Sequence, residues 1–265
     1  MFSSPIGVFD SGLGGLTVLK SLQLALPNEN FIYLGDTAHL PYGNKGIQSV
    51  FKYSKNIIDF FLSHDTKAVV IACNTASAVA YEDLKNIYDI PIFDVVTPSV
   101  NFTEKFSKNR NVGVIGTYST INSGAYQKSF INIKSNCKIK EVACPLFVPL
   151  IEEGWHEKPV AKEIAYLYLN QFNKYNIDTL ILGCTHYPIM EKTIKEVIQN
   201  DITLVFSGNT LGIELSTYLK MHNKDNKINV SPKTNFYVTD FPQKFDELGS
   251  RFLGEKLHSV QGITI

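Results

Sequence analysis

The chain has 265 residues, which is long for one compact core and sufficient for two small lobes. Hydrophobic residues make up 44% of it and charged residues 19%, and 25 basic residues balance 25 acidic ones, so the formal net charge is zero. This composition is typical of a globular protein and argues against a strongly basic nucleic-acid-binding protein. The sequence also has no run of about 18 apolar residues that would predict a membrane helix.

Short apolar runs alternate with longer amphipathic segments along the chain. The expected strands cover residues 6–9, 31–34, 68–72, 92–96, 112–115, 139–142, 179–182 and 203–206. The expected helices cover residues 16–26, 47–62, 76–88, 123–130, 161–172 and 189–198. This alternation predicts an α/β fold with mainly parallel sheets flanked by helices.

A weak internal repeat relates the two halves of the chain. The segment 6–11 reappears as 112–117, and the segment 70–75 reappears as 181–186, at offsets of 106 and 111 residues. Each segment of the second pair ends an apolar strand with a cysteine that has a threonine close behind it. Chance coincidence is the alternative, but the repeat of chemistry as well as hydrophobicity favours two lobes of one topology.

The repeat predicts how the lobes are built. Residues 1–97 and 208–265 are expected to form the first α/β lobe, and residues 98–207 the second, related by a pseudo-twofold axis. Open α/β sheets bind ligands at the carboxyl ends of their strands. We therefore expect the active site in the cleft between the lobes.

The cysteines are the most informative residues. The first nine residues lack the features of a signal peptide, so we expect a cytoplasmic protein with reduced thiols. Their spacing matches neither a CxxC pair nor a zinc site, so no metal is expected. The four cysteines are Cys73, Cys137, Cys144 and Cys184.

Cys73 and Cys184 occupy the repeated position, whereas Cys137 and Cys144 do not and are expected to be structural. Cys73 precedes a predicted helix, whose amino end lowers the pKa of a thiol from about 8.5 and favours the thiolate. Cys184 is followed by Thr185 and His186, and an imidazole can exchange protons with a thiol. Two thiols without a disulfide or metal suit proton transfer at carbon from opposite faces, which inverts a stereocentre.

Two turns carry further candidate ligands. Asp10 and Ser11 follow the first strand and precede a glycine-rich turn, which predicts a carboxylate-binding corner or, alternatively, a simple cap. Tyr42 and Gly43 could supply a hydroxyl and a backbone N–H to a small polar ligand, although Pro-Tyr-Gly is also an ordinary turn sequence.

The second half offers two more candidates. Thr117 and Thr120 could bind a carboxylate through their hydroxyls or only cap a helix. Glu152 could orient His186, although paired acids after an apolar run more often form a solvated helix end.

Five segments together resemble the glutamate racemase family. They are residues 10–16, 35–43, 72–77, 148–154 and 183–188, in the family's order and spacing. The Cys-Thr-His sequence in the last of them distinguishes this family from aspartate racemases. The resemblance extends over nearly the whole chain.

The resemblance implies the reaction. Family members interconvert L- and D-glutamate without pyridoxal phosphate or another cofactor, supply D-glutamate for peptidoglycan, and often form homodimers; no nucleic acid or membrane is required. Cys73 would act on D-glutamate with help from Asp10, and Cys184 on L-glutamate with help from His186 and Glu152. The residues expected to hold the substrate are Asp10, Ser11, Pro41, Tyr42, Gly43, Asn74, Thr75, Thr117, Thr120, Thr185 and His186.

The mechanism has to stabilise negative charge on carbon without an electron sink. We expect preorganised donors from Ser11, Asn74, Thr75, Thr185 and nearby backbone N–H groups to do this. One departure is Phe206, which precedes Ser-Gly where many members of the family have Asp; no catalytic role is assigned to it. The alternatives are an aspartate racemase, decarboxylase or isomerase of the same superfamily, a two-lobed amino-acid-binding protein, and a pyridoxal-phosphate racemase.

Overall fold

Two parallel sheets form the framework of the protein. The computed structural model describes residues 4–198, 201–227, 231–257 and 259–265. The first sheet has the order β10-β9-β2-β1-β3-β4 and contains β1 (Ile6–Asp10), β2 (Phe31–Gly35), β3 (Ala68–Ile71), β4 (Ile92–Phe93), β9 (Thr234–Val238) and β10 (Val260–Gly262). The second has the order β6-β5-β7-β8 and contains β5 (Asn111–Gly116), β6 (Lys138–Ala143), β7 (Thr179–Gly183) and β8 (Thr203–Phe206).

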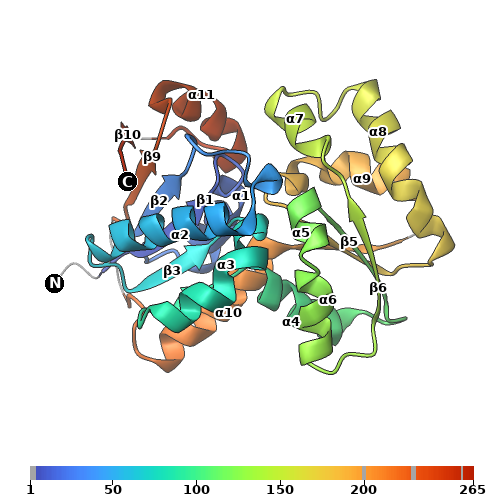
Figure 1. The fold of residues 1–265 in the computed structure, drawn as a ribbon, viewed down its shortest axis with the longest axis horizontal. Helices are drawn as coiled ribbons and strands as arrows, with labels where there is room; N and C mark the ends of the chain where they lie inside the picture. The colour runs from blue at the N-terminus through green and yellow to red at the C-terminus, as the bar shows by residue number, and fades with distance from the viewer. Residues whose placement is uncertain (1–3, 199–200, 228–230, 258) are drawn as a thin grey trace.

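The two sheets share one strand order. The order β2-β1-β3-β4 in the first is repeated as β6-β5-β7-β8 in the second, and every strand pair is parallel. All eight predicted strands are present. The sequence did not predict β9 and β10, which return the end of the chain to the first sheet (Figure 1). The α/β prediction is confirmed, whereas the boundaries of the lobes stay a prediction.

Helices cover both sheets. They are α1 (Leu16–Ala25), α2 (Ile47–Leu62), α3 (Asn74–Ile87), α4 (Val96–Phe106), α5 (Tyr118–Asn122), α6 (Ala125–Asn132), α7 (Phe147–Glu152), α8 (Pro159–Leu169), α9 (Glu191–Val197), α10 (Ser207–Met221) and α11 (Pro242–Leu253). Three 3₁₀ turns complete the set: η1 (Tyr42–Asn44), η2 (Asn170–Lys174) and η3 (Tyr187–Met190). Among the described helices, none has the length and apolar composition needed to cross a membrane.

Some element boundaries differ from the prediction for local reasons. The strand expected over 92–96 ends at Phe93, because the Asp94 carboxylate accepts the N–H groups of Val96 and Thr97 and begins α4. The helix expected over 123–130 corresponds to α6, which begins at Ala125 after Gly124 adopts a left-handed conformation with φ of 63°; the short α5 before it was not predicted.

Alternate residues of the strands face different cores. In β1, Ile6 and Val8 belong to a cluster that also includes Leu180 of β7 and Leu211 of α10, so this core is continuous between the lobes. Phe9 faces a second cluster under α2 and α3. In the other sheet, a third cluster packs beneath α4 and α6.

Strand register sets the position of the site. Phe9 of β1 pairs with Ile71 of β3, so the chain after each strand emerges at the same sheet edge. Gly116 of β5 pairs with Gly183 of β7 in the same way. The residues that follow these pairs include Asp10 and Cys73 in one lobe and Thr117 and Cys184 in the other.

Candidate active site

One cavity, of about 320 Å³, lies where the carboxyl ends of the two sheets meet. Every candidate catalytic or substrate-binding residue lines it except Thr120, which lies just behind. The lining candidates are Asp10, Ser11, Pro41, Tyr42, Gly43, Cys73, Asn74, Thr75, Thr117, Glu152, Cys184, Thr185 and His186. Sequence reasoning missed most of the remaining wall, which is formed by Gly12, Leu40, Asn44, Tyr118, Pro145, Val148 and Pro149. The resemblance of segments 10–16, 35–43 and 148–154 gave a signal for Gly12, Leu40, Val148 and Pro149, and nothing in the sequence pointed to the other three.

Cys73 caps α3. Its Sγ accepts the backbone N–H of Ala76 at 3.5 Å and lies 3.9 Å from the hydroxyl of Ser11. Burial nevertheless raises the pKa of the thiol to about 12, and the Asp10 carboxylate adds to the rise. The prediction of a ready thiolate at Cys73 is therefore wrong for the free protein, because burial outweighs the contribution of the helix end.

Cys184 has an imidazole as its neighbour. Its Sγ lies 3.9 Å from Nδ1 of His186, and Nε2 of His186 lies 3.1 Å from Oε1 of Glu152. Burial lowers the pKa of His186, but its bonds to Cys184 and Glu152 outweigh this and raise the pKa to about 10. These contacts favour the cationic form of His186, and the structure brings Glu152 to the position from which it can orient the ring.

Asp10 lies between the lobes. Its carboxylate accepts the N–H of Gly12 at 2.9 Å and the hydroxyl of Thr185, from the other lobe, at 3.4 Å. A Cβ at Gly14 would stand 2.2 Å from Oγ1 of Thr185 and 2.4 Å from Nδ1 of His186. The glycine-rich turn therefore lets the first lobe approach the Thr185–His186 segment, a reason that the sequence did not reveal.

Three hydroxyls from both lobes meet at one wall of the cavity. Thr75 lies 3.0 Å from Thr117 and 3.2 Å from Thr120, and Thr117 lies 3.0 Å from Thr120. Thr117 also caps α5 by accepting the N–H of Thr120. Capping and ligand binding are compatible for these residues, because a hydroxyl that accepts a backbone N–H keeps its own proton, which can turn to a carboxylate.

Tyr42 does not offer its hydroxyl proton to the cavity. The hydroxyl donates to Oδ2 of Asp36 at 2.6 Å, and the same buried carboxylate accepts from Thr239 and contacts His39. In this structure the hydroxyl is therefore occupied, and its donation to a ligand stays a prediction. Tyr42 lines the cavity with its ring, and its hydrogen bond anchors the turn to Asp36.

The side-chain NH₂ group of Asn74 is likewise already hydrogen-bonded within the protein. Its Nδ2 donates to the hydroxyl of Tyr126 at 3.0 Å and to that of Ser207 at 3.2 Å, so the expected role of this amide as a donor to substrate is corrected.

Phe206, the residue that departs from the family's pattern, is half-buried against the core that spans the lobes and does not line the cavity.

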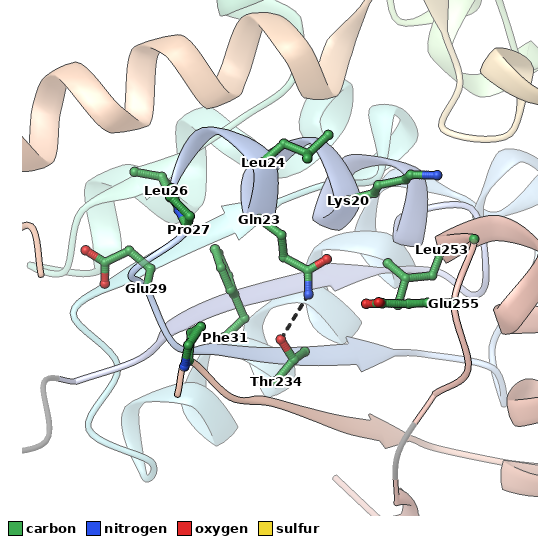
Figure 2. Close-up of a pocket in the computed structure, with 12 residues that line it drawn as sticks. Lys20, Gln23, Leu24, Leu26, Pro27, Glu29, Phe31, Thr234, Leu253 and Glu255 are labelled. Carbon is green, nitrogen blue, oxygen red and sulfur yellow. Dashed lines mark hydrogen bonds between the residues drawn. The ribbon is translucent and has the colours of Figure 1, made fainter. Parts of the chain in front are cut away.

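A second cavity, of about 410 Å³, lies on the first lobe beside α1 and β9 (Figure 2). Gln23 donates to Thr234 at its floor, and the buried carboxylate of Glu29 is paired with Lys67 at 2.6 Å. No described residue of this wall is a cysteine or histidine, so it lacks the acid–base groups of the first cavity. Within the described parts of the chain, no group of three or more His, Cys, Asp or Glu side chains could hold a metal ion.

Comparison of the sequence with known families and proteins finds racemases. The family model for Asp/Glu/Hydantoin racemase matches residues 8–215. A glutamate racemase from Syntrophus aciditrophicus is 40% identical over 261 residues, covering 98% of this chain and 97% of that protein.

Solved structures agree with the sequence comparison. The crystal structure of a glutamate racemase isoform from Bacillus anthracis superimposes with a TM-score of 0.96 at 34% identity, covering 100% of this chain and 99% of that one. That of the glutamate racemase from Francisella tularensis in complex with D-glutamate gives a TM-score of 0.92 at 38% identity, covering 100% and 98%.

Proposed function

The chain belongs to the Asp/Glu/Hydantoin racemase family of enzymes, and from that premise we propose that it interconverts L- and D-glutamate without a cofactor. The observation that carries the proposal is that Cys73 and Cys184, at equivalent strand ends of two lobes, line one cavity. The relative crystallised with D-glutamate supports glutamate as the substrate.

The two thiols exchange roles during turnover. In the L-to-D direction, the Cys184 thiolate removes the α-proton of L-glutamate, and the Cys73 thiol delivers its proton to the opposite face of the carbanion. One C–H bond breaks and one forms, so the protein ends with the proton on Cys184 and the negative charge on Cys73. The D-to-L direction is the reverse of these steps. The pKa of the Cys73 thiol, about 12, makes Cys73 a proton donor in the free protein.

The surroundings stabilise the charges that move. The cationic His186 places positive charge 3.9 Å from the Cys184 sulfur, and Glu152 holds the ring in that orientation. The hydroxyls of Thr75, Thr117 and Thr120 can rearrange to bind a substrate carboxylate. A buried site makes such preorganised interactions stronger than they are in water.

Proton NMR in deuterated water tests the reaction directly. L-Glutamate is incubated with purified protein and no added cofactor, while optical rotation is recorded in parallel. Loss of the α-proton signal together with decay of rotation to zero supports the proposal. Unchanged signal and rotation with folded, reduced protein would exclude glutamate racemisation, and aspartate would then be tested.

The proposed role in the cell is to supply D-glutamate for peptidoglycan from the cytoplasm. Depletion of the protein in its host should make growth dependent on added D-glutamate. We also propose that the protein is a homodimer, which light scattering tests by giving the mass of one or two copies of the 29.7 kDa chain.

A further inference from the structure

The amide of Asn74 has a fixed orientation because of a neighbour that can only accept. The Ser207 hydroxyl, at the start of α10, donates to the backbone carbonyl of Leu182. A carbonyl carries no proton, so the Ser207 oxygen is left to accept. The group of Asn74 that faces Ser207 is therefore its NH₂, which donates at 3.2 Å.

The second amide proton is also used. Nδ2 of Asn74 donates to the hydroxyl of Tyr126 at 3.0 Å, and Tyr126 of α6 is completely buried. The ring of Tyr126 lies against Gly183, where a Cβ would stand 3.1 Å from its edge, so the absence of a side chain there admits the ring. Both acceptors of the amide thus come from outside the first sheet.

This arrangement leaves one unsatisfied atom. Asn74 is 2% exposed and lines the cavity, and its Oδ1 is buried with no hydrogen-bond partner among the residues that the structure describes. A buried acceptor without a donor is unfavourable by enough to be rare in folded proteins. The oxygen is therefore a buried acceptor without a partner, on a residue that lines the cavity.

Glutamate has one group that can satisfy it. At neutral pH both carboxylates can only accept, and the α-ammonium is the sole donor. We infer that Tyr126 and Ser207 are positioning residues that hold the Asn74 amide with its oxygen toward the α-ammonium of the substrate. This inference rests on the proposed function and adds two residues that do not touch the substrate themselves.

The test compares Ser207→Ala, Tyr126→Phe and the double variant with the wild type. Each variant removes one acceptor and allows the amide to turn its NH₂ toward the cavity. We expect KM for glutamate to rise about three- to tenfold in each single variant and further in the double variant, with kcat changed less than about twofold. Ser99→Ala is the matched control, because Ser99 is a buried serine that bonds to Val95 and Thr210 away from the cavity.

A ligand without the ammonium separates positioning from general damage. Glutarate keeps both carboxylates of glutamate but has no donor, so its inhibition constant should be the same in wild type and variants. An unchanged KM for glutamate in the double variant would overturn the inference, as would an equal loss of affinity for both ligands. If glutarate does not inhibit the wild type, the KM-against-kcat pattern decides.

Failure of the proposed function gives a different result. In that case the wild-type protein itself does not racemise glutamate. Binding of L-glutamate by calorimetry then tests the positioning role in the same variants. A dissociation constant that does not change in the double variant, or no binding to the wild type, would overturn it.

Discussion

The two cysteines occupy equivalent strand ends but have opposite electrostatic surroundings. Cys73 caps α3 and lies near the carboxylate of Asp10, which with burial raises the pKa of its thiol to about 12. Cys184 is followed by the short turn η3 and has the cationic ring of His186 beside it. The same backbone arrangement therefore places the Asp10 carboxylate near one thiol and the His186 imidazolium beside the other.

This difference assigns a starting state to the free protein. The raised pKa of Cys73 favours its thiol form, and the imidazole lies beside Cys184, so in the proposed mechanism the free site would act first on L-glutamate. Enantiomers have equal free energies, so kcat/KM for racemisation has to be the same in both directions. The asymmetry can appear only in kcat and KM separately, in isotope effects and in single-face proton exchange.

The largest effect is expected from removing either thiol. Cys73→Ala and Cys184→Ala should each reduce racemisation by more than about 10³-fold, because one face of the substrate loses its acid–base group. The remaining cysteine should still exchange the α-proton of one enantiomer with deuterated water. Cys73→Ala should exchange L-glutamate only, and Cys184→Ala should exchange D-glutamate only and more slowly, as NMR of each pure enantiomer measures.

Cys137→Ala is the control for this pair, since Cys137 lies outside the cavity beside Glu104 and Arg110. Its racemisation rate should equal that of the wild type. Exchange of both enantiomers at similar rates by a single-cysteine variant would contradict the assignment of one thiol to each face.

The next largest effect is expected from His186→Asn. Loss of the cation beside Cys184 should reduce kcat/KM about 10²-fold in both directions. Proton transfer at Cys184 should then limit the rate, so the primary isotope effect on kcat/KM should be larger with α-deuterated L-glutamate than with α-deuterated D-glutamate. His222→Asn, an exposed histidine at the end of α10, is the control. Equal isotope effects for the two enantiomers would count against a role for His186 on one face only.

A smaller effect, mainly on pH dependence, is expected from Glu152→Gln. The pKa of His186 is raised to about 10 in part by Glu152, and the cation is present below that pKa and lost above it. The variant should lower this pKa, so the alkaline loss of kcat/KM should begin at a lower pH, with about a tenfold decrease near neutrality. The exposed neighbour Glu153→Gln should keep the wild-type profile. An unchanged alkaline limb in Glu152→Gln would show that the limb reports another group.

The sequence predicted the positions of the two thiols, because these depend on residues close together in the chain. Each cysteine follows its own apolar strand, and the parallel register then places both at sheet edges, so the thiols could be assigned from the chain alone. The pKa of Cys73 could not, because it depends on burial by residues of both lobes. The same limit applies to the Tyr42 hydroxyl, whose partner Asp36 also binds Thr239, 203 positions away along the chain.

The strands that the sequence did not predict also depend on contacts between distant parts of the chain. The strand β9 pairs with β2 and β10 pairs with β9, and no local pattern specifies either pairing. The approach of Gly14 to Thr185 and His186 is also a contact between lobes, and the sequence pattern alone predicts only a ligand-binding role for the glycine-rich turn. Family resemblance supplied the role of Glu152, which residue chemistry alone left between two alternatives.

The smallest catalytic effect is expected from Tyr42→Phe, on the Cys73 side of the cavity. If the hydroxyl serves only to hold Asp36, its removal should change kcat and KM by less than about threefold, yet lower the free energy of unfolding by about 1–3 kcal/mol because a buried carboxylate loses a donor. Tyr88→Phe breaks the same kind of bond at an exposed site, to Asp59, and should cost less stability. Thermal unfolding and steady-state kinetics measure both. A rise in KM of tenfold or more in Tyr42→Phe would mean that the hydroxyl turns to the substrate during turnover, and the first-lobe side of the site would then be mobile where the free structure holds it fixed.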